Sequence, residues 1–188
     1  MKTQVVLALT LLSAISAVNG FGSGAPEGVC ASMTPGHHVD PSTDPIPYKI
    51  VLSKNVAKGA ETVDITITSK SGERDFKGFI IQVRKPGEEK AYGEFKEFDD
   101  ESGQTLNCFG TENSAVTHAS NDKKKSITAE WIAPNEDAVY EVLFTIVGEH
   151  YGEFWTPQTH GEKITVTKDP KAQIATQRSQ RSQFTVYK

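Results

Sequence analysis

The stretch Glu61–Ser69 reads ETVDITITS and alternates apolar with polar side chains over its length. Val63, Ile65 and Ile67 take every second position, and acidic or hydroxyl-bearing residues lie between them. Because successive side chains of a β-strand point to opposite faces, this period of two predicts a strand with one buried and one solvated face. Such a strand needs partner strands that cover its apolar face.

The rest of the chain supplies those partners as short segments of similar pattern. The stronger candidates are Tyr48–Leu52, Phe79–Arg84, Ile127–Trp131, Tyr140–Ile146 and Ile164–Thr167, and the weaker ones are Tyr92–Phe98 and Ala115–His118. Short alternating strands separated by turns predict an all-β fold, an immunoglobulin-like antiparallel β-sandwich. The expected core comprises Val63, Ile65, Ile67, Ile81, Val83, Trp131, Val142, Phe144 and Ile146.

Residues 1–20 have the three parts of a signal peptide. Lys2 gives a positive start, Val5–Leu12 is apolar, and small residues lead to Gly20. The apolar run is shorter than the ~20 residues that a membrane-spanning helix needs. We expect cleavage after Gly20, or alternatively after Ala17, and a secreted protein without a membrane span.

The charge of the chain argues against a nucleic-acid ligand. The formal net charge is −4 at pH 7, and no basic stripe marks any of the strand candidates.

We assign the folded domain to residues 21–168. The last segment, residues 169–188, carries four basic residues and no acidic residue after its first position. Low hydrophobicity and charge of one sign predict a disordered basic tail there.

Cys30 and Cys108 are the two cysteines of the chain. In a secreted protein an isolated pair predicts one disulfide, with two buried free thiols as the alternative. Cys30 lies in residues 21–47, an arm whose five prolines favour extended or looped backbone. Since Cys30 precedes the first strong strand, the bond should tether this arm to the body and not cross the core.

No enzyme motif is present: the sequence has no G-x-S-x-G, Walker loop, H-E-x-x-H or C-x-x-C. We therefore expect no catalytic residue, no cofactor and no metal. His37 and His38 could fold back towards His118 as metal ligands, but hydrogen-bonded or exposed imidazoles are the favoured interpretation. The run Asp99-Asp100-Glu101 offers oxygen ligands for calcium, but it matches no EF-hand and is more typical of a solvated face.

Two further motifs are candidates for binding. Lys123-Lys124-Lys125 lies in a predicted turn, where three ammonium groups could contact phosphates, for instance those of a bacterial lipid. The alternative is a charged turn that discourages edge pairing. Phe154-Trp155 lies near a strand end and could be a binding anchor, although core packing is the favoured interpretation.

Several motifs in their order along the chain resemble a reeler domain over about residues 21–168. They are Gly24-Ala25-Pro26 with Cys30, Met33-Thr-Pro35-Gly-His37, Pro47-Tyr48, Phe76–Phe79 leading into Ile81–Arg84, Thr117-His118-Ala119 after Cys108, Trp131–Pro134 and Phe154-Trp155. A single reeler domain behind a signal peptide is similar to the noduler-like insect defence proteins.

This resemblance implies an immunoglobulin-like sandwich, secretion into haemolymph, and binding of microbial surfaces such as lipopolysaccharide, or of haemocytes. It carries over Cys30 and Cys108 as a disulfide and supplies no catalytic residue. We expect a monomer. The alternative is an extracellular matrix or cell-interaction module without microbial binding, since reeler domains also occur in matrix proteins and in membrane ferric reductases.

Overall fold

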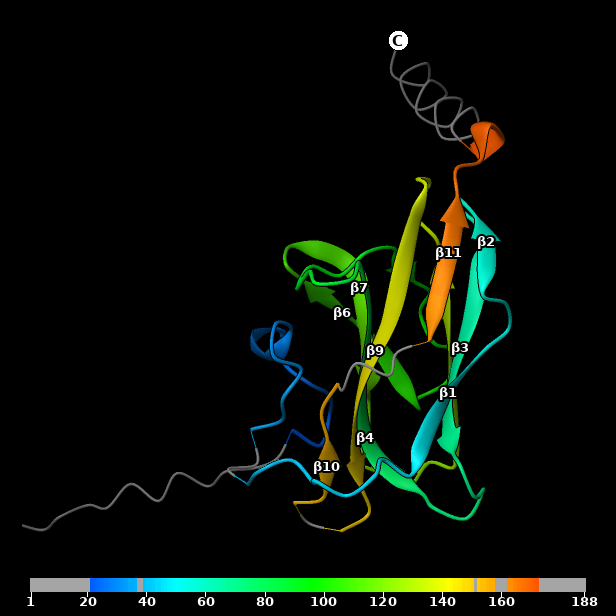
Figure 1. Cartoon of the computed structure of the whole chain (residues 1–188). Helices are drawn as coiled ribbons and strands as arrows, with labels where there is room; N and C mark the ends of the chain where they lie inside the picture. Colours follow the sequence, from blue (N-terminus) through cyan, green and yellow to red (C-terminus); the bar gives the residue numbers. More distant parts are fainter. Residues whose placement is uncertain (1–20, 37–38, 151, 158–161, 173–188) are drawn as a thin grey trace, which may run out of the picture.

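Two β-sheets form the body of the protein in the computed structural model, which describes residues 21–36, 39–150, 152–157 and 162–172 (Figure 1). The signal peptide expected at residues 1–20 lies outside the described residues, as does most of the expected tail. The smaller sheet has the strand order β1 (Tyr48–Leu52), β3 (Thr62–Ser69), β8 (Ser126–Ile132), β5 (Glu94–Phe95).

The larger sheet has the strand order β2 (Val56–Lys58), β11 (Lys163–Thr167), β9 (Ala138–Gly148), β4 (Phe76–Arg84), β7 (Thr111–His118), β6 (Gly103–Cys108), and β10 (Phe154–Trp155) pairs with β9. The predicted sandwich is confirmed, but it is not wholly antiparallel, because β2 and β11 are parallel. The chain leaves the smaller sheet after β1 and joins the edge of the larger one as β2.

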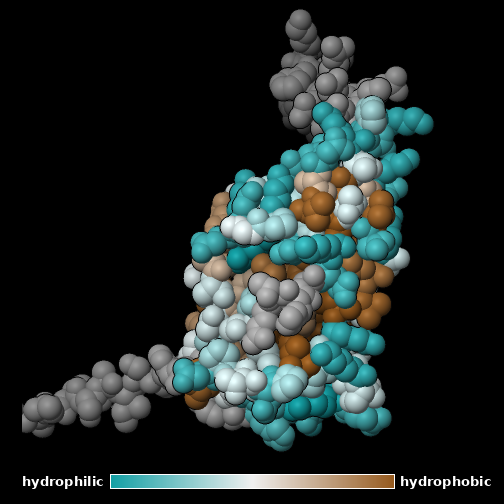
Figure 2. Space-filling model, viewed as in Figure 1, coloured by the Kyte–Doolittle hydropathy of each residue, from teal (hydrophilic) through white to brown (hydrophobic). Residues whose placement is uncertain are grey.

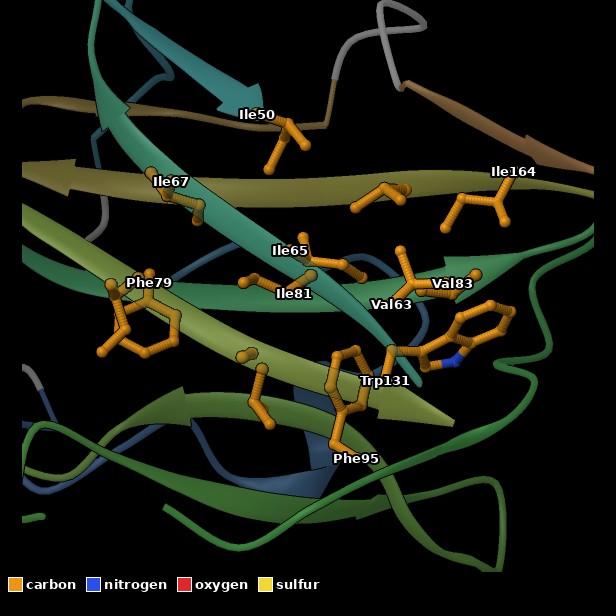
Figure 3. Close-up of a cluster of buried hydrophobic side chains, with 14 of the residues drawn as sticks. Ile50, Val63, Ile65, Ile67, Phe79, Ile81, Val83, Phe95, Trp131 and Ile164 are labelled. Atoms are coloured by element: carbon orange, nitrogen blue, oxygen red, sulfur yellow. The ribbon is translucent and has the colours of Figure 1, made fainter. Parts of the chain in front are cut away.

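The core lies between the sheets, where β3 faces β4. Figure 3 shows Val63 and Ile65 of β3 close to Val83 and Ile81 of β4, and all four are fully buried. Trp131 of β8 is also fully buried. These residues confirm the alternation that was read from the sequence, because every second side chain of β3 and β8 points into the core.

Phe144 is the exception among the predicted core residues, because it is only partly buried. Its neighbours on the same face of β9, Val142 and Ile146, are fully buried. The pairing of β9 gives the reason. β11 pairs with residues 138–141 and β10 with residues 146–147, so no strand of the described residues pairs with Phe144 on that side.

Three strands were not predicted, and they are short or polar. β2 has three residues and β10 has two, which is too few for a pattern, and β6 lies at a sheet edge with mixed polar side chains. β5 has two residues where the sequence indicated a strand over Tyr92–Phe98. β4 departs from its predicted alternation, since every residue from Gly78 to Arg84 is buried.

The N-terminal arm explains why β4 is buried on both faces. The arm contains a 3-10 turn, η1 (Glu27–Val29), and lies on the side of the larger sheet that faces away from β1 and β3 (Figure 1). Polar side chains on this outer face form hydrogen bonds with the backbone of the arm. Gln82 Nε2 and Arg84 Nη2 donate to Cys30 O, Thr145 Oγ1 donates to Met33 O, and Gln104 Nε2 donates to Ser23 O. Thr117 Oγ1 accepts from Ala25 N. The arm is thus a third layer.

The disulfide joins Cys30 of the arm to Cys108 at the end of β6, with 5.6 Å between the two Cα atoms. Both cysteines pack with Ala91 and Ala115 in a small apolar cluster separate from the main core. The bond therefore tethers the arm to the outer face of the larger sheet and does not cross the core, as the sequence predicts.

Tyr140 carries a polar contact at the edge of the core that makes stability depend on pH. Its hydroxyl donates to Glu136 Oε1 at 2.6 Å, and Lys85 Nζ lies 3.1 Å from the same oxygen. The hydrogen bond from Tyr140, together with Lys85, holds the pKa of Glu136 below its ordinary value of 4.5. A carboxyl with a lowered folded-state pKa stabilises the protein above its unfolded pKa, and this stability is lost as pH falls through the folded-state value.

We therefore expect Glu136→Gln to lower the free energy of unfolding at neutral pH and to lose this effect as pH falls well below 4.5. Urea unfolding of both proteins over that pH range measures the difference. Glu112→Gln is the matched control, because Glu112 is exposed and has no ion-pair or hydrogen-bond partner for its carboxylate among the described residues. A Glu136→Gln deficit that stays constant with pH would contradict the assignment.

Candidate functional site

The lysine loop, Lys123-Lys124-Lys125, connects β7 to β8 at one end of the sandwich. The backbone of Lys124 anchors it, since Lys124 N donates to Phe76 O at 2.8 Å and Lys124 O accepts from Phe76 N at 2.9 Å. These two bonds fix the loop against the start of β4. The loop is thus held in one backbone conformation.

The middle lysine does not contribute a free ammonium group. Lys124 is 8% exposed, and its Nζ donates to the carbonyl oxygens of Ser120 and Asp122, both at 2.8 Å. A longer contact of 3.4 Å joins it to Lys77 O. Burial lowers the pKa of this ammonium. The three-lysine patch expected from the sequence is therefore reduced to Lys123 and Lys125, because Lys124 satisfies the carbonyls of its own loop.

Lys123 and Lys125 remain accessible, with side chains 59% and 76% exposed. Lys123 Nζ lies 3.1 Å from Glu149 Oε1, and Lys125 Nζ lies 3.7 Å from Asp75 Oδ1. The contact with Lys123 holds the pKa of Glu149 below its ordinary value. Solvent screens the pair with Glu149, whereas Asp75 Oδ1 is buried and has no hydrogen-bond partner of its own.

The aromatic pair is part of the core. Phe154 and Trp155 are 0% and 2% exposed. Trp155 Nε1 donates to Asp44 O at 3.0 Å, and its ring packs edge-on against Tyr48 with centroids 5.7 Å apart. Core packing was the favoured interpretation of this motif, and it is confirmed.

The residues considered as metal ligands are placed differently. The ring nitrogens of His118 contact backbone atoms of Phe79 and Phe21, while His37 and His38 lie outside the described residues. The Ser102 hydroxyl and Ser102 N, the latter at 2.9 Å, both donate to Asp100 Oδ1, and these two bonds lower the pKa of Asp100. Within the described ranges, no three histidine, cysteine or acidic side chains are grouped so as to hold a metal ion.

Two surface features were not predicted. A groove of about 320 Å³ lies between residues 96–102 and the outer part of β8. Asp99 and Asp100 line this groove, and the sequence indicated only that they belong to a solvated face. No sequence pattern shows that β5 ends at Phe95 and leaves a groove beside them. On the face that carries β9 and β11, apolar side chains are visible between hydrophilic borders (Figure 2). Val56 of β2 and Val139 of β9 are exposed and pair with Thr165 of β11 from its two sides.

The protein is a β-sandwich module with an arm tethered by a disulfide, and comparison with known families identifies its family. The Reeler domain family matches residues 28–172, and the chain belongs to this family. Among the described residues no helix has the length and apolarity needed to cross a membrane.

Insect proteins with defence names are similar over most of their length. The chain is 33% identical to "Putative defense protein 3" of Antheraea mylitta over 148 residues, which cover 78% of this chain and 88% of that protein. It is 35% identical to "Putative defense protein Hdd11" of Hyphantria cunea over 146 residues, covering 76% and 84%. "Putative ferric-chelate reductase 1" of Xenopus laevis is 33% identical, but the match spans 26% of that larger protein.

Solved reeler domains share the fold. The human F-spondin reeler domain superimposes with a TM-score of 0.56 at 18% identity, covering 68% of this chain and 94% of the F-spondin fragment. A second structure of the same domain, the Reelin-N domain of F-spondin, gives 0.55. At this identity the likeness concerns the fold alone, and it confirms the sandwich predicted from the strand pattern.

Proposed function

We propose that this protein is a secreted component of insect innate defence. It binds microbial surface components, lipopolysaccharide among them, and catalyses no reaction. The observation that carries the proposal is the similarity to insect defence-named proteins over 84–88% of their length. The signal-peptide pattern of residues 1–20 and the disulfide support an extracellular site of action, the haemolymph. A protein that only binds a ligand needs no set of catalytic residues.

The proposed contact is with the phosphate groups of the microbial lipid through Lys123 and Lys125. The net charge of −4 opposes general attraction to anionic surfaces, so local cations must make the contact. Both ammonium groups extend from a loop whose backbone is fixed, which reduces the ordering cost of binding. Lys124 holds the loop in place through its bonds to Ser120 O and Asp122 O and does not contact the ligand.

We expect Lys123→Ser/Lys125→Ser to weaken binding to lipopolysaccharide vesicles about tenfold, since charge-assisted hydrogen bonds to two phosphates are lost. Vesicle co-sedimentation at low and high salt measures the effect, which screening should diminish. The matched control is Lys54→Ser/Lys163→Ser, which removes two lysines that are also each paired with one carboxylate. Equal binding by both double variants would show that the lysine loop does not contact lipopolysaccharide.

The interaction-module alternative makes a different prediction for the whole protein. The same fold occurs as a domain of F-spondin. If the chain bound no bacterial, fungal or lipopolysaccharide surface, the matrix or cell-interaction function would replace the microbial one. A pull-down on each surface with bare resin as the blank separates the two functions.

A further inference from the structure

The strand β8 has an edge that is only half paired. β5 pairs with Trp131 and Ile132 alone, and one further backbone bond joins Lys96 N to Glu130 O at 3.0 Å. Beyond Glu130, towards Ser126, no described segment forms a backbone hydrogen bond with this side of β8. The smaller sheet therefore ends there in an open edge.

The register of β8 shows which backbone groups face this edge. The bond to Lys96 directs the carbonyl of Glu130 away from β3, whereas Ala133 N donates to Glu61 O on the β3 side. Because backbone groups alternate in direction along a strand, the N–H and C=O of Thr128 share the direction of Glu130. Thr128 thus presents one donor and one acceptor to the open edge, while its ladder with β3 uses the residues on either side of it.

The groove of about 320 Å³ runs along this edge, and its charged residues are mostly acidic. Lys96, its one lysine, already forms an ion pair with Glu130. No lysine or arginine of the described chain pairs with Glu97, Asp99 or Asp100 on the opposite wall. The groove therefore holds uncompensated negative charge beside unpaired backbone groups.

We propose that the open edge of β8 binds an extended cationic polypeptide segment, which adds as a strand within the groove. Unpaired strand edges bind extended peptides through main-chain hydrogen bonds, and the flanking side chains select the sequence. Alternate side chains of the added strand would face the carboxylates of the wall, which requires Lys or Arg at every second position. The residues between them face Phe98 and Ile127 and should be small and apolar. This inference does not depend on the lipopolysaccharide proposal.

A peptide of alternating lysine and valine, labelled with a fluorophore, tests the proposal by fluorescence anisotropy. We expect it to bind the intact protein, and a glutamate–valine peptide of equal length not to bind. Thr128→Pro removes the N–H that faces the groove without removing a bond to β3, so it should weaken binding about five- to tenfold. Thr128→Ala is the matched control, because it also loses the contact with Thr66 Oγ1 but keeps the N–H.

A second pair of variants keeps the test decisive if Thr128→Pro perturbs folding. Asp99→Asn/Glu130→Gln should weaken binding at low salt, whereas Glu73→Gln/Glu112→Gln, with equal charge change outside the groove, should not. Added peptide should also slow hydrogen exchange at the Thr128 amide. Equal affinity of Thr128→Pro and Thr128→Ala, or equal binding of the two peptides, would overturn the proposal.

Discussion

Trp131→Ala is expected to lower the free energy of unfolding by about 3–5 kcal/mol, as for other buried large aromatics. Trp131 is fully buried on β8, and its ring packs edge-on against Tyr140 with centroids 5.4 Å apart. Its Nε1 donates to Tyr92 O at 2.9 Å, so the substitution also leaves that carbonyl without its donor. Gly93 lies against the same ring, where a Cβ would come within 2.2 Å of Nε1, so this site is filled closely.

Urea unfolding followed by circular dichroism measures this loss. Val139→Ala is the control, because Val139 is 42% exposed on the outer face of β9 and should lose well under 1 kcal/mol. The predicted order then places Phe144→Ala between the two, since its ring is only partly buried. A Trp131→Ala loss no larger than that of Val139→Ala would mean that the packing around β8 is not as described.

Removing the disulfide is expected to cost about 2–5 kcal/mol. The two cysteines are 78 residues apart, and the loop-closure entropy for that length is about 4.5 kcal/mol. In Cys30→Ser/Cys108→Ser, Arg84 still donates to Cys30 O and Ala31 O, so the arm keeps part of its attachment. We therefore expect a less stable protein that still folds, with the arm detaching before the sandwich unfolds.

Two measurements separate these effects. Urea unfolding gives the total loss, and hydrogen exchange at the Met33 amide, which bonds to Val29 O, reports on the arm. The expected result is a larger increase in exchange rate at Met33 than in β3, whose amides open only when the sandwich unfolds. Reduction of the natural protein should reproduce the double variant. If both cysteines of the natural protein react with a thiol label after unfolding without reductant, the bond is absent.

The sequence predicted those strands whose two faces meet different surroundings. β3 and β8 have one face in the core and one in solvent, so their alternation is visible. β4 was also predicted, as Phe79–Arg84, but not the burial of its outer residues Gln82 and Arg84 under the arm. Their carbonyl partner on Cys30 lies 52 and 54 residues away, and no local pattern reveals such a contact.

The candidate site was predictable only in position. The three lysines of the loop are equivalent in the sequence, and they are distinguished only when β4 brings Lys77 O and Phe76 alongside Lys124. The open edge of β8 was not predictable at all. It arises because β5 stops after two residues, whereas the composition of residues 92–98 favours a longer strand.

The tethered arm also has a consequence for the order of events during synthesis. Cys30 leaves the ribosome 78 residues before Cys108, a delay of about 4–16 s at ordinary elongation rates. The outer face that receives the arm is completed still later, because Thr145 of β9 bonds to Met33 O. The arm is therefore synthesised before the sandwich and is among the last segments to dock, and the Cys30 thiol lacks its partner until Cys108 has been made.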